Sequence, residues 1–349
     1  MFNLSSRRYT GAKSKLLESI DSVIKQNFDY TQRKNLSFFD VFGGTGVVSE
    51  YFLKKPHFNQ FIINDFLHSN YAIYQGFFKQ EAFSKDTLEK LVNTFNTIDS
   101  KAQNYYSSNF GDKFFSLKDS MKIGVIREEI ENLKEANQIN TKEYYILLSS
   151  LLYSLDRVAN TVGHYDAYRK NITLKDKFIF ELIQPILTES KIEIFREDSN
   201  KLVKDFIKEK RKIDVAFIDP PYNSRQYSRF YHLLETITLN DKPKLHGTAL
   251  KREPENMSRY CKVGAETAFS ELCKDLSKIA SFLVVTYNNT YTSKSSSSAN
   301  KISLESLKTI LESFGTITSH KIPHKAFNTG KTDFKNHMEY IFVCKIFNF

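Results

Sequence analysis

The chain has 349 residues, 41% of them hydrophobic and 14% aromatic, which is enough for a sizeable core in one large or two smaller domains. Its formal net charge of +10 favours a polyanionic partner without establishing one, and no apolar run approaches the ~20 residues of a membrane span. The first residues contain no apolar signal region, and the three scattered cysteines have no metal-ligand spacing. We therefore expect a cytoplasmic protein with no bound metal and no membrane segment.

A basic arm over residues 7–13 leads into a helical pattern whose apolar positions, from Leu16 to Phe28, lie on one face. Residues 11–14 read Gly-Ala-Lys-Ser, but the upstream glycine of a P-loop is missing and no glycine directly precedes the lysine. The arm therefore does not indicate an NTPase.

The next segment combines a buried strand, a glycine-rich turn and a helix. The strand is expected over residues 36–42, the turn over 43–46 and the helix over 47–54, an arrangement that lets backbone approach a nucleotide closely. A further strand ends in Asp65, which is placed to accept hydrogen bonds from ribose hydroxyls. These features predict a cofactor that contains adenosine, and a plain βαβ turn with a solvated Asp65 is the alternative.

Residues 67–188 are expected to be largely helical and to form an insertion into one α/β domain. Residues 144–158 carry a strong apolar stripe typical of a core helix. The loop that follows holds His164 and Tyr165 among cations and hydrogen-bonding side chains, a mixture that suits phosphate and base contacts. A loop with buried tyrosines explains the same composition equally well.

The most informative stretch covers residues 213–222, where an apolar, β-branched run ends in Asp219-Pro220-Pro221-Tyr222. Two prolines cannot donate to a sheet ladder, so the strand must stop there. The carboxyl end of a strand is where open α/β sheets handle ligands. A carboxylate, a rigid turn and an aromatic ring would therefore meet at a strand tip.

The rest of the chain alternates helices and strands around a polar loop over residues 240–264 and a serine-rich loop over 292–300. No repeat or linker divides it cleanly. The expected elements are strands over 191–196, 282–287, 316–322 and 339–346, the last two able to pair antiparallel, and helices over 199–210, 231–239, 266–279 and 304–314.

Phe42-Gly43-Gly44-Thr45-Gly46 followed by Asp219–Tyr222 resembles the F-x-G-x-G and D-P-P-Y pair of S-adenosylmethionine-dependent amino methyltransferases. Residues 9–13, placed first, resemble the opening element of the α group of N6-adenine DNA methyltransferases, the Dam-like enzymes. The runs over 219–235 and 160–167 are similar to Fok-type restriction-system methylases. The resemblance covers most of the chain.

This resemblance implies a Rossmann-like α/β methyltransferase fold, with a mostly parallel seven-stranded sheet and a C-terminal antiparallel strand. Residues 1–66 and 189–349 would form the catalytic domain, and 67–188 the helical target-recognition insertion. The implied reaction transfers a methyl group from S-adenosylmethionine to the N6 amino group of a flipped adenine in double-stranded DNA. A restriction-modification role, with a cognate restriction endonuclease as partner, would follow.

The resemblance also assigns roles to single residues. The Asp219 carboxylate and the Pro220 carbonyl would hold the target amine, Pro221 would stiffen the turn, and Tyr222 would stack on the base. From the family's motifs the cofactor contacts would be Tyr9, Lys13, Asp40, Phe42, Gly44, Gly46, Asp65 and Asp198. Expected DNA contacts are Arg225, Arg229, Lys251 and Arg252, taken as phosphate contacts, with His164 and Tyr165 from the loop after the core helix.

The chemistry explains why these groups suit an adenine amine. The exocyclic nitrogen is a poor nucleophile because its lone pair is delocalised into the ring, and two fixed acceptors favour a more tetrahedral nitrogen. No metal is required. Three alternatives remain at this point: methylation of cytosine N4, for which Ser is more usual at the position of Asp219, methylation of an RNA base, and a catalytically dead DNA-binding relative.

Overall fold

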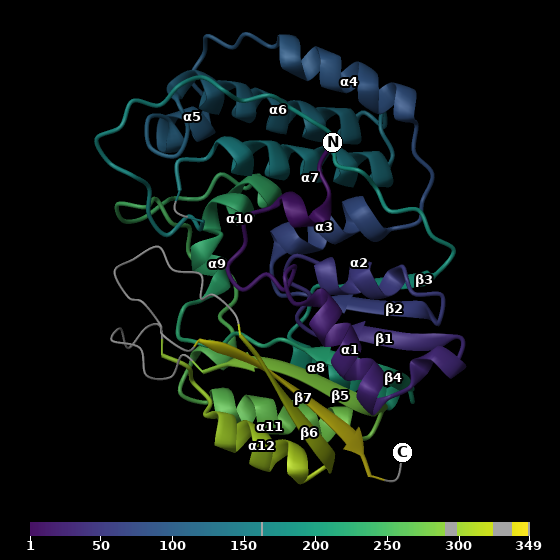
Figure 1. Cartoon of the computed structure of the whole chain (residues 1–349). Coiled ribbons are helices and arrows are strands. Elements are labelled where there is room, and N and C mark those ends of the chain that lie inside the picture. Colours follow the sequence, from purple (N-terminus) through teal and green to yellow (C-terminus); the bar gives the residue numbers. More distant parts are fainter. Residues whose placement is uncertain (162, 290–298, 324–336, 348–349) are drawn as a thin grey trace. The chain divides into compact units, whose positions relative to one another are not determined.

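The computed structural model describes residues 1–161, 163–289, 299–323 and 337–347 (Figure 1). The chain forms two compact units. Unit 1 comprises Met1–Thr10, Leu67–Thr188 and Tyr227–Glu255, and unit 2 comprises Gly11–Phe66, Glu189–Gln226 and Asn256–Phe349. Residues 67–188 lie in unit 1 together with the first ten residues and 227–255, so unit 1 includes more of the chain than the expected insertion.

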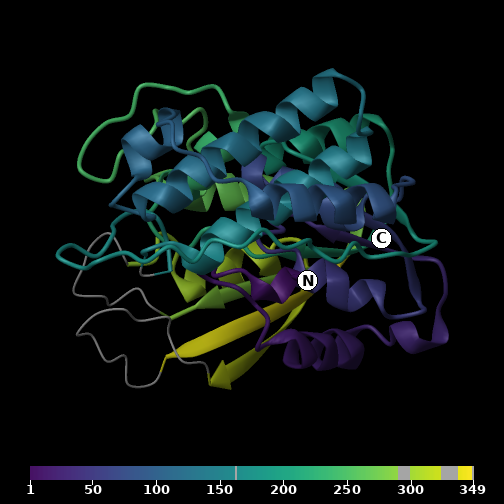
Figure 2. The ribbon, with the colours of Figure 1, turned by 90° about the horizontal axis from the view of Figure 1, so that it is seen from above.

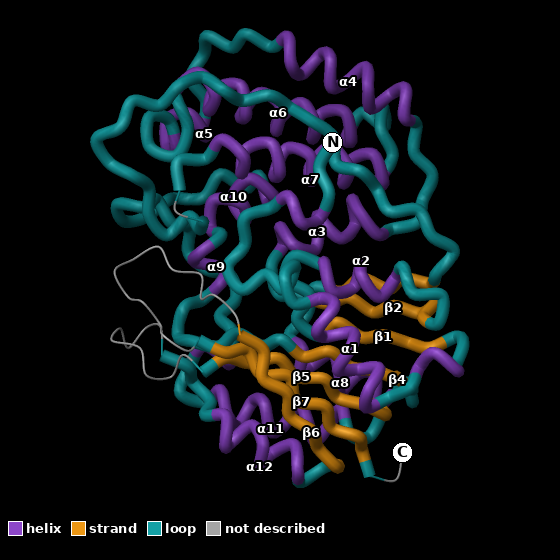
Figure 3. The backbone as a smooth tube through the Cα atoms, viewed as in Figure 1, coloured by secondary structure: helices purple, strands orange, loops and turns teal. Residues whose placement is uncertain are grey.

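Unit 2 is built on a seven-stranded sheet in the order β3-β2-β1-β4-β5-β7-β6 (Figures 1 and 3). The strands from β3 to β5 are parallel, and β7 runs antiparallel to both of its neighbours. This confirms the expected fold class and its reversed C-terminal strand. The strands are β1 (Leu36–Asp40), β2 (Phe58–Asn64), β3 (Lys191–Phe195), β4 (Ile213–Ile218), β5 (Ala280–Asn288), β6 (Gly315–Pro323) and β7 (Met338–Ile346).

Helices cover both faces of this sheet, so its central strands are apolar on both sides. Every residue of β1 is buried, and Phe38 and Phe39 point to opposite faces. The ring of Phe38 stacks on Phe52 with centroids 4.6 Å apart, and the ring of Phe39 meets Phe206 at 5.6 Å. The helices of unit 2 are α1 (Leu17–Asn27), α2 (Val47–Leu53), α8 (Ser199–Lys208), α11 (Ala265–Leu276) and α12 (Leu304–Glu312).

The topology brings several chain segments to one edge of the sheet. Because β1, β2, β3, β4 and β5 are parallel, their carboxyl ends reach the same edge. The reversed β7 starts where β5 ends, and Asn288 of β5 pairs in register with Glu339 of β7. The beginning of the last strand therefore lies at the edge where the parallel strands finish.

Unit 1 is helical, and its helices lie alongside one another (Figure 2). The core helix expected over 144–158 is confirmed, since every residue of α7 from Ile146 to Asp156 is buried. Asn140 caps this helix by accepting from the Glu143 backbone N–H, and the Glu143 side chain accepts from the Asn140 N–H in return. The helices are α3 (His68–Phe78), α4 (Lys85–Thr97), α5 (Tyr105–Phe110), α6 (Leu117–Glu135), α7 (Thr141–Val158), α9 (Tyr227–Phe230) and α10 (His232–Leu239).

The helical expectation is wrong for the end of the insertion, because the described residues after α7 up to 188 contain no helix. This segment is held by other contacts, among them an isolated bridge between Phe2 and Ile183. The Phe2 N–H donates to the Leu182 carbonyl at 2.9 Å, which explains why the first residues group with unit 1. In the part of the chain that the structure describes, no helix has the length and hydropathy that crossing a bilayer requires.

Candidate active site

The Asp-Pro-Pro-Tyr turn leaves the sheet directly after Ile218, the last residue of β4. The two prolines have no N–H to extend the ladder, as the sequence predicts. The turn is held through the Tyr222 carbonyl, which accepts from the Lys301 N–H at 2.8 Å and from the Tyr287 hydroxyl at 3.1 Å. These two contacts hold the turn that carries Asp219 in place.

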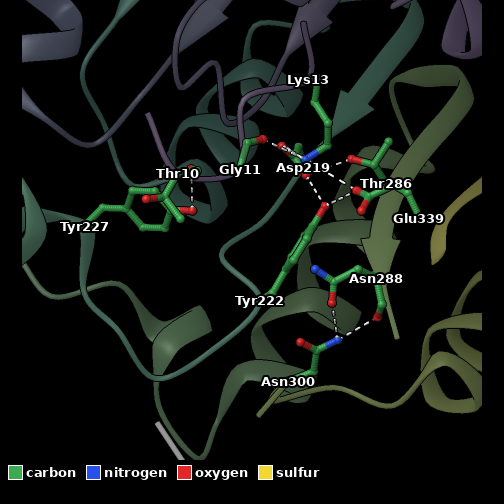
Figure 4. Close-up of polar contacts among 10 residues, drawn as sticks. All are labelled: Thr10, Gly11, Lys13, Asp219, Tyr222, Tyr227, Thr286, Asn288, Asn300 and Glu339. Atoms are coloured by element: carbon green, nitrogen blue, oxygen red, sulfur yellow. Dashed lines mark hydrogen bonds and ion pairs between the residues drawn. The ribbon is translucent and has the colours of Figure 1, made fainter. Parts of the chain in front are cut away.

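Three donors surround the Asp219 carboxylate (Figure 4). Lys13 Nζ lies 2.8 Å from Oδ2, while the Thr286 hydroxyl at 2.8 Å and the Tyr222 hydroxyl at 2.6 Å both contact Oδ1. The lysine comes from the basic arm ahead of α1 and the threonine from the end of β5. The structure therefore brings together Lys13, Asp219 and Tyr222, which the motifs singled out separately.

A second carboxylate, that of Glu339, lies in the same cluster and was not expected from the sequence. Its Oε1 is 3.4 Å from Lys13 Nζ and 2.7 Å from the Tyr222 hydroxyl. Thr286 was missed as well. The sequence showed only an acid at the start of the last strand. That position reaches the active-site edge because β7 runs antiparallel to β5.

Charge and burial shift the titration of two groups here. Burial acts to lower the pKa of Lys13, but the Asp219 and Glu339 carboxylates outweigh it and leave that pKa above its ordinary value. Burial raises the pKa of the Tyr222 hydroxyl, and the same two carboxylates raise it further. Lys13 is therefore charged and Tyr222 neutral at physiological pH.

The glycine turn between β1 and α2 has the conformation that its composition predicts. Gly44 and Gly46 have φ angles of 53° and 80°, in the left-handed region that glycine adopts without strain. The Gly44 N–H donates to Asp65 Oδ2 at 2.9 Å, and Gly46 is the N-cap of α2. Asp65, which follows β2, therefore anchors the turn. The ring of Phe42 packs edge-on against Tyr260 at 5.0 Å.

Two further acids stand at neighbouring strand tips. Asp198 caps α8 by accepting from the Lys201 N–H at 3.1 Å. Asp40 is buried at the end of β1, where its Oδ2 accepts from the Ser49 hydroxyl at 2.7 Å. Burial raises the pKa of Asp40 to about 7, the Ser49 hydrogen bond opposes that rise, and Asp219 and Asp65 add to it.

Comparison with known proteins agrees with this geometry. The family model described as D12 class N6 adenine-specific DNA methyltransferase matches residues 9–310. The chain belongs to this family. It is therefore an adenine-specific DNA methyltransferase, and S-adenosylmethionine is its methyl donor.

Similar proteins include modification methylases of type II systems. The chain is 30% identical to Modification methylase StsI of Streptococcus sanguinis over 92% of its own length, and it spans 49% of that protein. It is 29% identical to Type II methyltransferase M.NlaIII of Neisseria lactamica over 94% of this chain and 95% of the relative. It is 31% identical to Type II methyltransferase M.CviAII of Paramecium bursaria Chlorella virus 1 over 97% of this chain and 98% of the relative. The chain thus spans about half of StsI and nearly all of the other two.

A solved structure of a SAM-dependent methyltransferase from Agrobacterium tumefaciens aligns with 95% of this chain and 61% of that chain. The identity is 11% and the TM-score 0.35, so this likeness adds nothing to the assignment.

The residues of unit 2 fit the chemistry of S-adenosylmethionine. Gly44 and Gly46 have no Cβ atoms to keep an adenosine away, and Gly46 stands at the amino end of α2. Asp65 and Asp198 supply acceptors at the tips of adjacent strands. A molecule with ribose hydroxyls and a cationic sulfonium matches such a set of donors and acceptors. When bound, it supplies the methyl group.

Tyr9 lies in unit 1, whereas the other seven expected cofactor residues lie in unit 2. Its ring stacks on Tyr231, with centroids 4.7 Å apart and planes within 5°, and the Arg7 guanidinium lies 5.0 Å from its centroid. The structure therefore places Tyr9 in an aromatic cluster of unit 1. Its assignment to the cofactor stays a prediction.

The loop after α7 corrects one expected DNA contact. Tyr165 is buried, its hydroxyl donates to Asp156 at 2.8 Å, and its N–H donates to the Phe230 carbonyl at 2.8 Å. A ring so enclosed cannot reach a base or phosphate, so the buried-tyrosine alternative is the one observed. His164, partly exposed, stacks on Phe230 at 4.5 Å.

The expected phosphate contacts differ in how free their charges are. Arg252 forms two hydrogen bonds with Asp241, at 3.0 and 2.8 Å, and Lys251 pairs with Asp166. Arg229 is exposed, whereas Arg225 lies in unit 2 and is partly buried. A cavity of about 450 Å³ in unit 1 has a lining that includes Lys170, Arg229, Lys251, Arg252, Asp166 and Glu253.

No group of three or more His, Cys, Asp or Glu side chains that could hold a metal gathers among the described residues.

The buried Asp40 predicts a pH dependence of stability. Its folded pKa of about 7 lies above the ordinary value of 3.8, so the folded protein holds an extra proton between these values. The stabilisation is complete below about pH 4 and is lost as the pH rises through 7. In Asp40→Asn, which keeps an acceptor for Ser49, this dependence disappears.

Thermal melting of the cofactor-free protein at pH 6 and pH 8 measures this effect. Between pH 6 and pH 8 the free energy of unfolding of the wild type should fall by about 1 kcal/mol more than that of Asp40→Asn. This difference corresponds to a relative drop of about 2 °C in Tm. Asp205→Asn, which changes a partly exposed carboxylate of α8 that pairs with Lys208, is the control and should follow the wild type. Parallel melting of wild type and Asp40→Asn would contradict the assignment.

Proposed function

We propose that this chain methylates the N6 amino group of a flipped adenine within one double-stranded DNA sequence, as the modification enzyme of a restriction-modification system in the cytoplasm. The observation that carries this proposal is the placement of Asp219 at the tip of β4, in the same unit as the glycine turn and Asp65. The type II names of two relatives matched over nearly their full length support the restriction role. A cognate endonuclease is part of the proposal.

In this function Asp219 and Pro220 act as the two acceptors of the target amine. The carboxylate takes one N–H and the Pro220 carbonyl the other, which weakens conjugation of the nitrogen with the ring. The rigid turn, held through the Tyr222 carbonyl, keeps both acceptors in place before the base arrives. After transfer the nitrogen loses one proton, for which Asp219 is the adjacent acceptor.

Tyr222 has to change its contacts to stack on the base. In the observed arrangement its hydroxyl reaches Asp219 and Glu339, and its ring meets Tyr287 with centroids 4.5 Å apart. A base inside a duplex must be extruded before it can enter such a site. Stacking on Tyr222 would then contribute about 1–3 kcal/mol to holding it.

Unit 1 is proposed as the part that recognises the target sequence. Support comes from the cavity in this unit and from the exposed cation Arg229 in its lining. The hairpin between His246 and Lys251, joined by two backbone hydrogen bonds of 2.8 Å, forms part of the same lining. Arg252 and Lys251 mainly hold this loop through their ion pairs with Asp241 and Asp166.

The function is tested by sequencing the DNA of a host that expresses the protein, with a method that distinguishes modified bases. We expect N6-methyladenine at one sequence motif. N4-methylcytosine at a motif, or modification of RNA alone, would replace the proposal, and no modified base would favour a catalytically dead relative.

Asp219→Asn should reduce kcat for methyl transfer by at least about 1,000-fold, because a preorganised charged acceptor is replaced by a neutral one. The amide keeps the size of the side chain, so Tm should change by only a few degrees. Transfer of a labelled methyl group to DNA measures the rate. Turnover near that of the wild type would contradict the mechanism.

Arg229→Gln should lower the slope of log binding constant against log salt for DNA by about 1, since one phosphate contact is lost. Filter binding or fluorescence anisotropy at four salt concentrations measures the slope. Lys308→Gln, an exposed cation on α12, is the matched control and should leave it unchanged. An equal slope in the wild type and Arg229→Gln would remove Arg229 from the DNA contacts.

A further inference from the structure

Glu339 is a buried carboxylate at the active-site edge, and the methyl transfer described above gives it no part. Its side chain is 3% exposed. Burying a carboxylate is costly unless it is paired and hydrogen-bonded. Its partners are Lys13 Nζ at 3.4 Å and the Tyr222 hydroxyl at 2.7 Å. Both of these partners also contact Asp219 (Figure 4).

Two donors are thus shared between two carboxylates. The Tyr222 hydroxyl has one proton and lies 2.6 Å from Asp219 and 2.7 Å from Glu339, so it can donate to only one of them at a time. Lys13 Nζ is nearer to Asp219, at 2.8 Å, than to Glu339. Its third contact, to the Gly11 carbonyl at 3.0 Å, involves neither acid.

Binding of the target adenine requires Asp219 to accept one more hydrogen bond. Asp219 has to accept an N–H of the target amine, but Lys13 and Thr286 already donate to it, and the Tyr222 hydroxyl lies within hydrogen-bond distance. A carboxylate offers about four acceptor positions, so three donors leave little room for a fourth with good geometry. A shift of Lys13 or the Tyr222 hydroxyl toward Glu339 would free acceptor capacity on Asp219 for the amine.

The three donors are not equivalent. Thr286 is fully buried and, among the described residues, hydrogen-bonds to no carboxylate other than Asp219, so it suits a fixed contact that orients Asp219. Lys13 and Tyr222 each have Glu339 within reach. If they shift toward Glu339, the buried ammonium group keeps an anionic partner while Asp219 becomes accessible.

We propose that Glu339 is a positioning residue that takes over Lys13 and the Tyr222 hydroxyl when Asp219 binds the target amine. This inference rests on the function proposed above. Glu339 touches neither the base nor the methyl group in this role. It acts as an alternative acceptor for the Lys13 ammonium group and the Tyr222 hydroxyl, which otherwise contact Asp219.

The test is Glu339→Gln, which keeps the shape and an acceptor oxygen but removes the charge that would hold Lys13. We expect kcat for DNA methylation to fall at least tenfold. Calorimetric titration should find Kd for S-adenosylmethionine within threefold of the wild type, and Tm should change by less than about 3 °C. Glu193→Gln, which changes a partly buried, ion-paired carboxylate of β3, is the matched control and should keep wild-type kcat.

A double-mutant comparison separates positioning from a merely structural role. If Glu339 acts by receiving Lys13, Glu339→Gln should cost less than twofold in kcat when added to Lys13→Met. A structural role would instead reduce kcat by the same factor in both backgrounds. In the single variant Lys13 keeps the Asp219 carboxylate at 2.8 Å, so Glu339→Gln leaves no buried ammonium group without an anionic partner and should fold. A further tenfold loss would overturn the inference.

A base-flipping readout completes the test, with 2-aminopurine in place of the target adenine. The wild type should raise its fluorescence on binding, and Glu339→Gln should show less than half of that rise, because Asp219 stays occupied. Failure of the wild type to methylate adenine would refute the proposed function. Methylation by the wild type together with wild-type kcat in Glu339→Gln, or loss of cofactor binding in that variant, would refute the inference alone.

Discussion

One buried ammonium group, that of Lys13, pairs with two carboxylates at the edge of the sheet, and the geometry of the site depends on it. The Asp219 and Glu339 carboxylates both contact Lys13 Nζ, so they lie close enough to repel each other if this cation were absent. The contact joins three segments that are far apart in the chain: the arm before α1, the turn after β4 and the start of β7. The arm is therefore part of the active site as well as a basic extension.

Local patterns in the sequence were sufficient for the elements on which this site is built. The strand before the glycines and the strand before Asp219 each follow from composition and periodicity within a short window. Glu339 could not be found in this way because its place at the site depends on the pairing of β7 with β5, and the place of Thr286 depends on the pairing of β5 with β4. Each of these pairings joins strands that are far apart in the chain, and no residue near Glu339 indicates which strand lies beside it.

Burial and ion pairing were the other limits of prediction. The residues around Tyr165 are typical of a nucleic-acid contact, yet its hydroxyl is buried and donates to the carboxylate of Asp156, at the end of the preceding helix. Likewise Lys251 and Arg252 count toward the net charge but are paired with acids. A basic sequence thus overstates the charge available to a polyanion, since only the structure shows which cations are already neutralised.

Neither unit is a continuous piece of chain. The polypeptide passes from one to the other after residues 10, 66, 188, 226 and 255, so each unit is assembled from three separate segments. A single crossover between the genes of two relatives therefore cannot exchange one unit intact. If unit 1 reads the DNA, new sequence preferences in this lineage would arise by substitution within it rather than by domain shuffling, and an engineered chimaera would need five junctions.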